Sequence, residues 1–151
     1  MTAIKRDLVE LTEAGSPYAR TLGSKVRELG DGRVVLDLDP PEGLLNHVGG
    51  PHAATLFGLG ETAAAGVVVS VFEDLVQDGA IPLIKGAEIS YLSVAKGEVA
   101  ATATFVGDED GVRASMAERG VAVFPVEISI GTADGTETAR MRAEMALKRF
   151  L

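Results

Sequence analysis

The 151-residue chain carries 22 acidic and 14 basic side chains, which gives a formal charge of −8, and it has no cysteine. The negative charge argues against nucleic acid and anionic membrane surfaces as partners. The lack of cysteine excludes disulfides and thiolate metal sites and fits a reducing compartment, so we expect a cytoplasmic protein. The length and the 46% hydrophobic content suit one domain with its own core, which we expect to span residues 1–151.

The N-terminal third of the chain predicts a helix followed by a hairpin. Residues 1–15 place apolar side chains at helical spacing among charged ones, which is typical of an amphipathic helix. The Gly30-Asp31-Gly32 stretch predicts the turn of a β-hairpin. Residues 34–39 alternate as in a half-buried strand, and Pro40-Pro41 should end that strand because proline cannot donate a ladder hydrogen bond.

The most apolar stretch of the chain follows a loop and predicts one long helix over residues 52–76. This stretch is long enough to cross a membrane, but Glu61 near its middle and the lack of flanking basic residues favour a helix buried in the protein. Ala54, Gly58, Glu61 and Ala65 fall on one face of that helix. Because its neighbours on this face are small, we expect Glu61 to border a crevice.

The second half of the chain predicts strands. Turn residues at Lys96-Gly97-Glu98 and at Ala133-Asp134-Gly135 predict two hairpins, and residues 139–148 alternate between apolar and charged side chains. The polar stretch 108–120 between them predicts a short helix or a loop. A helix that is apolar on nearly all sides must be enclosed, so we expect an α+β fold with a curved antiparallel sheet around the central helix.

Four spaced residues in and before this helix carry a family resemblance. The chain resembles the hot-dog fold and, more narrowly, the phenylacetate-pathway (PaaI-like) acyl-CoA thioesterases. Those proteins have an asparagine, a glycine three residues on, a His-Gly-Gly that opens the central helix, and an acid nine residues after the histidine. Asn46, Gly49, His52 and Glu61 stand at those spacings, while Ala53-Ala54 replaces the two glycines.

Glu61 is the expected general base or nucleophile of a thioester hydrolysis. A carboxylate in an apolar crevice should have a raised pKa, which suits proton transfer near neutral pH. The alternative is a structural acid that pairs with an arginine or caps a backbone group in a subunit interface. No G-x-S-x-G elbow, clustered metal ligands or phosphate-binding loop offers a competing chemistry.

The residues before and at the start of the helix would complete the site. The backbone N–H groups of Ala53 and Ala54 would form an oxyanion hole, although every helix begins with such free groups. The resemblance also implies substrate contacts for Gly49 and Gly50. Asn46 would either orient a water or the thioester carbonyl, or simply form a turn.

His52, at the start of the helix, is expected to cap the first turn or hold the loop. The nine-residue separation from Glu61 makes a dyad within one helix implausible. His47 is expected to be loop surface.

The resemblance implies an acyl-CoA substrate, no cofactor and no metal. It also implies a homodimer, alone or paired into a dimer of dimers, in which Asn46 and His52 of one subunit face Glu61 of the other. Lys85, Lys96 and Arg113 are candidates for contacts to the phosphates of coenzyme A, although for each of them an ordinary solvated surface base is the favoured interpretation. The alternatives are a non-catalytic protein that binds acyl-CoA or another apolar ligand, and an interaction module without a ligand.

Overall fold

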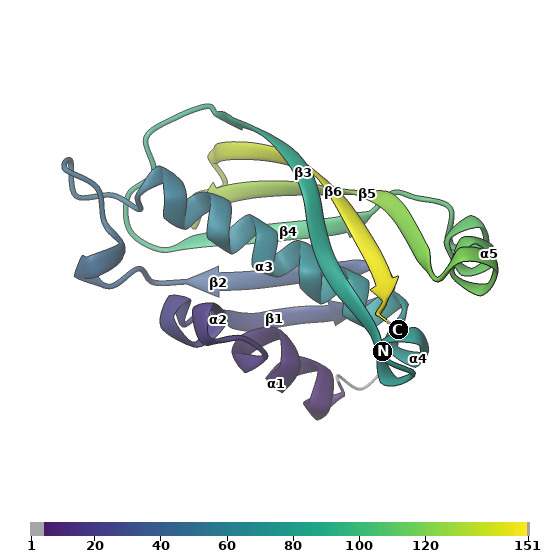
Figure 1. Ribbon diagram of the computed structural model, residues 1–151. Helices are drawn as coiled ribbons and strands as arrows, with labels where there is room; N and C mark the ends of the chain where they lie inside the picture. Colours follow the sequence, from purple (N-terminus) through teal and green to yellow (C-terminus); the bar gives the residue numbers. More distant parts are fainter. Residues whose placement is uncertain (1–4, 151) are drawn as a thin grey trace.

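The computed structural model describes residues 5–150 and has one curved, six-stranded sheet wrapped around a long helix (Figure 1). The helices are α1 (Arg6–Ala14), α2 (Pro17–Leu22), α3 (Ala53–Val71), α4 (Glu73–Gln77) and α5 (Glu109–Arg119), with a 3-10 turn over Glu42–Leu44. The strands are β1 (Lys25–Gly30), β2 (Arg33–Leu38), β3 (Ala80–Tyr91), β4 (Val99–Phe105), β5 (Val121–Thr132) and β6 (Glu137–Arg149).

The strand order is β1-β2-β4-β5-β6-β3, with every neighbouring pair antiparallel. The predicted α+β architecture is therefore confirmed.

Two of the predicted hairpins are confirmed. Asp31 and Gly32 both have positive φ angles, 53° and 74°, which matches the type I′ turn that the twist of two paired strands favours. The turn between β5 and β6 is held by Asp134, whose Oδ1 accepts hydrogen bonds from the Thr136 N–H and the Thr132 hydroxyl. Local turn chemistry was enough to place both.

The predicted hairpin at Lys96-Gly97-Glu98 is wrong. β3 pairs with β6 at the edge of the sheet, whereas β4 lies between β2 and β5, so the connection between β3 and β4 crosses the sheet. Gly97 does turn the chain, with φ 72°. Before that turn, however, the N–H of Leu92 donates to Thr138 O and keeps this part of the chain beside β6. A turn signal shows where a chain bends but does not select the strand that pairs next.

The central helix is shorter than the predicted 52–76 because Phe72 leaves the helical conformation (φ −115°, ψ 35°). Its ring is fully buried, with centroids 5.6 Å from Phe105 and 5.4 Å from Phe124. Arg113 from α5 lies 5.3 Å over the same ring and donates to Val71 O at the end of α3. Packing of this ring decides where α3 stops, and α4 continues as a separate short helix.

The N-terminal segment contains two helices where one was predicted over residues 1–15. α1 lies within that range, and residues 1–4 lie outside the described part of the chain. α2 follows Ser16, whose hydroxyl accepts from the Ala19 N–H, and Pro17 occupies the first helical position. Ser-Pro is a recognisable helix start, so this helix could have been predicted from the sequence.

α3 is enclosed by the sheet on one side and approached by α1 and α2 on the other (Figure 1). Among the described helices it alone is long and apolar enough to span a membrane, with a mean hydropathy of 1.5, yet 67% of that span is buried inside the fold. A Cβ at Gly60 would meet Met141 of the sheet, and one at Gly66 would meet Thr12 of α1, both at 2.9 Å. Glycines on opposite faces therefore allow the close packing of this helix.

Candidate functional site

The loop before α3 is built around Asn46. Its Oδ1 accepts hydrogen bonds from the N–H groups of Val48 and Gly50, both at 3.0 Å, and its backbone N–H donates to Gly50 O. The turn-forming function of this asparagine is thus present in the structure. Its side-chain oxygen is occupied by the loop itself.

We expect Asn46→Ala to lower the free energy of unfolding by about 1–2 kcal/mol, because two backbone donors lose their acceptor. Asn46→Asp keeps an acceptor oxygen and should retain most of that stability. Urea unfolding of the two variants beside the wild type measures the difference. Equal losses in both variants would contradict this role for the acceptor oxygen.

The glycines of the loop have separate structural reasons. Gly49 has φ 79°, a conformation that side chains rarely adopt. Gly50 is buried, and a Cβ there would lie 2.0 Å from Ala95 O in the connection between β3 and β4. The loop therefore packs directly against that connection, with Gly50 beside Ala95 and Lys96.

His52 is the N-cap of α3. Its Nδ1 accepts from the Ala54 N–H at 2.9 Å, which leaves Nε2 to carry the proton of the neutral ring. Of the two N–H groups predicted for an oxyanion hole, that of Ala54 is thus occupied by the cap, and no acceptor among residues 5–150 takes that of Ala53. Tyr91 donates its hydroxyl to Ala53 O and brings the end of β3 to the same place.

Glu61 lies on the side of α3 that faces α1 and α2. It is half-buried and borders a cavity of about 390 Å³, lined by α1, the turn to α2, α2, α3, α4 and the start of β3. Among the described residues 5–150, Glu61 is the only titratable side chain in that lining. Burial raises its pKa above the ordinary value of 4.5. The expectation of an acid beside a crevice thus matches the geometry.

Within one chain the structure does not bring Glu61 to the start of α3. Nine residues of helix separate Glu61 from His52, which is about 14 Å along the axis. Asn46 and His52 share the loop before α3, while Glu61 borders the cavity lined by α1, α2, α4 and the start of β3. A site that uses Asn46, His52 and Glu61 together therefore needs residues from two chains.

The three basic residues considered for contacts to the phosphates of coenzyme A differ in how far other side chains already hold them. Arg113 is held by Asp74 and Glu109 and stacks on Phe72, and these bonds raise the pKa of Arg113. It therefore belongs to the packing at the end of α3. Lys85 on β3 and Lys96 near the loop are exposed. Residues 5–150 contain no group of three or more side chains that could hold a metal ion.

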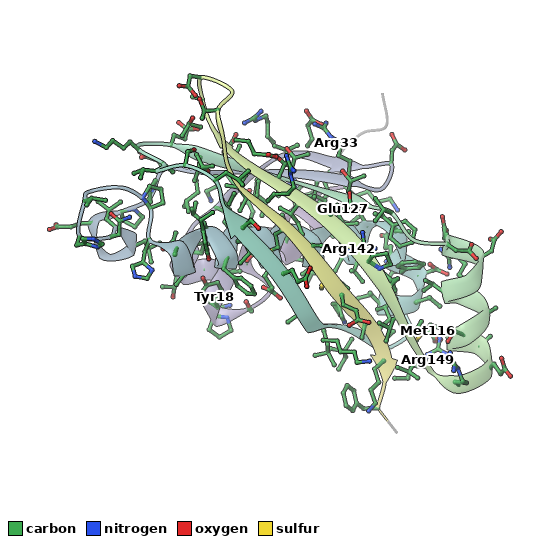
Figure 2. All side chains as sticks on the ribbon, turned by 90° about the horizontal axis from the view of Figure 1, so that it is seen from above. Tyr18, Arg33, Met116, Glu127, Arg142 and Arg149 are labelled. Carbon is green, nitrogen blue, oxygen red and sulfur yellow. The ribbon has the colours of Figure 1, made fainter. Side chains whose placement is uncertain are left out.

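Sequence reasoning missed two tyrosines near this layer of the molecule. Tyr91 touches the first residue of α3, and Tyr18 of α2 lies against Gly58, where a Cβ would be 1.8 Å from its hydroxyl. Figure 2 shows Tyr18 on the N-terminal helical segment. Recognition of the Ser-Pro helix start would have placed Tyr18 on a helix, though not against α3.

Comparison with known proteins yields one family and many related folds. The model of a domain of unknown function (DUF4442) matches residues 5–147, and no curated protein matches. The chain is similar to PA5026 of Pseudomonas aeruginosa, a protein of unknown function described as a "probable thioesterase". The identity is 24% over 99% of both chains, with a TM-score of 0.80.

Two further structures show the same fold. The thioesterase SAV0944 of Staphylococcus aureus is 21% identical over 88% of this chain and 99% of its own, with a TM-score of 0.71. Its structures include one with a glutamine and one with a glutamate replaced by alanine. A hypothetical thioesterase of Streptococcus pneumoniae, solved with coenzyme A, is 19% identical over 84% of this chain and 88% of its own, with a TM-score of 0.64. These likenesses establish the hot-dog fold.

Proposed function

This chain belongs to the DUF4442 family and has the hot-dog fold, and from this premise we propose that it is an acyl-CoA thioesterase that uses Glu61. The observation that carries the proposal is the Glu61 carboxylate, half-buried with a raised pKa beside an otherwise uncharged cavity of about 390 Å³. An uncharged, largely apolar lining suits an acyl chain. An acid with a raised pKa suits base catalysis near neutral pH.

Two chemical roles for Glu61 are consistent with this position. As a base, the carboxylate takes a proton from a water whose oxygen attacks the thioester carbonyl, and the C–S bond breaks to release coenzyme A. As a nucleophile, it attacks the carbonyl carbon itself, coenzyme A leaves, and water hydrolyses the resulting anhydride. In both, the N–H of Ala53 would stabilise the negative charge on the carbonyl oxygen.

The neighbouring proteins support the choice of residues. In the S. aureus thioesterase, the glutamine and the glutamate that were replaced by alanine are separated by as many residues as Asn46 and Glu61. In the S. pneumoniae neighbour, the ligand is coenzyme A. Both facts fit an acyl-CoA substrate for the present chain and an amide–acid pair in its site.

We further propose that the site is assembled in a homodimer. Among residues 5–150 no strand pairs with the outer edge of β3, and Ile81, Leu83 and Tyr91 of β3 are exposed, as is Leu92 directly after it. An open edge rich in apolar side chains favours pairing with a second copy. Such a dimer could bring Asn46 and His52 of one subunit toward Glu61 of the other and so overcome the separation within one chain.

Leu83→Lys should convert the proposed dimer to a monomer and abolish hydrolysis, because it removes an apolar side chain from the proposed interface and places a second lysine beside Lys85. Light scattering after gel filtration measures the mass. Val123→Lys on the interior strand β5 is the matched control, since Val123 is 43% exposed and Leu83 is 41% exposed. A monomeric wild type with full activity would contradict the dimeric site.

Release of free thiol from a panel of short, medium, long and aromatic acyl-CoA esters tests the activity itself. We expect turnover of at least one ester, and the panel then identifies the acyl class. The second candidate is a protein that binds acyl-CoA without hydrolysing it. It is favoured by the alanines at the start of α3 and by the Ala54 N–H, which His52 occupies. A rise in melting temperature with acyl-CoA and no thiol release would support binding alone.

A further inference from the structure

Tyr18 of α2 reaches the turn of α3 that precedes Glu61, because its hydroxyl fills the space that a side chain at position 58 would occupy. The Tyr18 hydroxyl lies where Gly58 has no side chain, since a Cβ at Gly58 would be 1.8 Å from that oxygen and 2.8 Å from Cζ of the ring. Any larger residue at position 58 would push the ring of Tyr18 away. The glycine at position 58 therefore leaves room for the phenol of Tyr18 from α2.

Helix geometry directs the Glu61 side chain toward Gly58 and the phenol of Tyr18. Residues three apart lie on neighbouring turns of one face, with Cβ atoms about 5–6 Å apart. Side chains on a helix lean toward its N-terminus, so the Glu61 carboxylate extends over the turn that contains Gly58. The phenol and the carboxylate thus share one side of α3, and the carboxylate also borders the cavity.

Tyr18 is the titratable neighbour of this carboxylate, and the other polar side chains of the cavity lining, Thr12, Ser16 and Thr62, are uncharged hydroxyls. The residues that α1, α4 and β3 contribute to the cavity lining carry no charge, as do those of α2 and of the turn before it. Burial and the negative charge of Glu61 both raise the pKa of Tyr18. A phenol with a raised pKa stays protonated at neutral pH and remains a hydrogen-bond donor.

We propose that Tyr18 is a positioning residue of the Glu61 site, whose hydroxyl donates a hydrogen bond to the ionised Glu61 carboxylate and fixes its direction. In the structure the negative charge of Glu61 acts on the Tyr18 phenol without a hydrogen bond between the two groups, and the proposed contact requires the Glu61 side chain to rotate toward Tyr18. The inference rests on the proposed function for its catalytic meaning. The contact itself is independent of any turnover.

Carbon-detected NMR titration of Glu61 in the wild-type protein and its variants tests the contact. A hydrogen bond to the charged form lowers the pKa of a carboxyl group, so Tyr18→Phe should raise the pKa of Glu61 by about one pH unit. Gly58→Ala should cause the same rise, because the added methyl displaces the hydroxyl. The double variant should show one such rise and not two. Gly43→Ala, where a Cβ has open space, is the control and should change nothing.

The pH profile of kcat/KM supplies the catalytic readout. If the protein hydrolyses an acyl-CoA, the acidic limb should move to higher pH in Tyr18→Phe and in Gly58→Ala by the amount seen in the titration. An unchanged Glu61 pKa in both variants, or two additive shifts in the double variant, would overturn the proposal. Because the titration needs no substrate, a failed thioesterase assay would leave this result readable and would count against the proposed function alone.

Discussion

Glu61→Gln is expected to lower kcat/KM for the preferred acyl-CoA by about a hundredfold or more, as the loss of a general base does. The glutamine keeps the size and shape of the side chain beside the cavity but can neither take a proton nor attack a carbonyl. Thiol release at saturating and limiting ester concentrations separates kcat from KM. A fall in kcat with little change in KM is expected, since the cavity that binds the acyl chain is unchanged.

Glu118→Gln on the exposed surface of α5 is the matched control and should leave the rate unchanged. The pH profile adds a second check on the wild type. Because burial raises the pKa of Glu61, the ionised form is lost as the pH falls through that raised value. We therefore expect the rate to decline at a higher pH than the ordinary 4.5 of a glutamate. A Glu61→Gln variant with wild-type turnover would reject Glu61 as the catalytic group.

Glu61→Gln should not destabilise the fold. Since the pKa of Glu61 is raised in the folded protein, the folded state binds more protons than the unfolded state between pH 4.5 and that raised value. Stability from this group is therefore present at low pH and lost as the pH rises through the window. At neutral pH, Glu61→Gln should melt at or above the wild-type temperature, so that lost activity cannot be ascribed to unfolding.

Phe72→Ala is expected to have the largest effect on stability, about 3–5 kcal/mol in the free energy of unfolding. The ring is completely buried between Phe105 and Phe124, and Arg113 packs over it. Its removal leaves a cavity at the point where α3 ends and deprives Arg113 of α5 of its contact with the ring. Urea unfolding followed by circular dichroism measures the loss.

Phe150→Ala is the matched control, because Phe150 is 58% exposed and its removal should cost little. Arg113→Lys should fall between the two. It keeps the charge but loses the planar group that contacts Phe72, Asp74 and Val71 O together. Equal stability of Phe72→Ala and Phe150→Ala would mean that this aromatic cluster does not hold the end of α3.

The sequence by itself determined the local features of this protein. The type I′ turn at Asp31-Gly32, the alternation of β6 and the long apolar helix all follow from interactions between residues close in the chain. These patterns were enough to predict an α+β fold with one enclosed helix. They also singled out Glu61, because a lone acid among small and apolar helical neighbours is conspicuous without any tertiary information.

Only the tertiary structure decided which strands pair, where α3 ends and what faces Glu61. β3 pairs with β6 instead of β4. Strand pairing depends on contacts across the whole sheet, and the residues of the turn at Gly97 do not determine which strand pairs next. α3 ends at Phe72 since that ring finds its pocket among β4, β5 and α5. Tyr18 reaches Gly58 from α2 across a distance of 40 positions in the chain, and contacts of that kind have no periodic signal in a sequence.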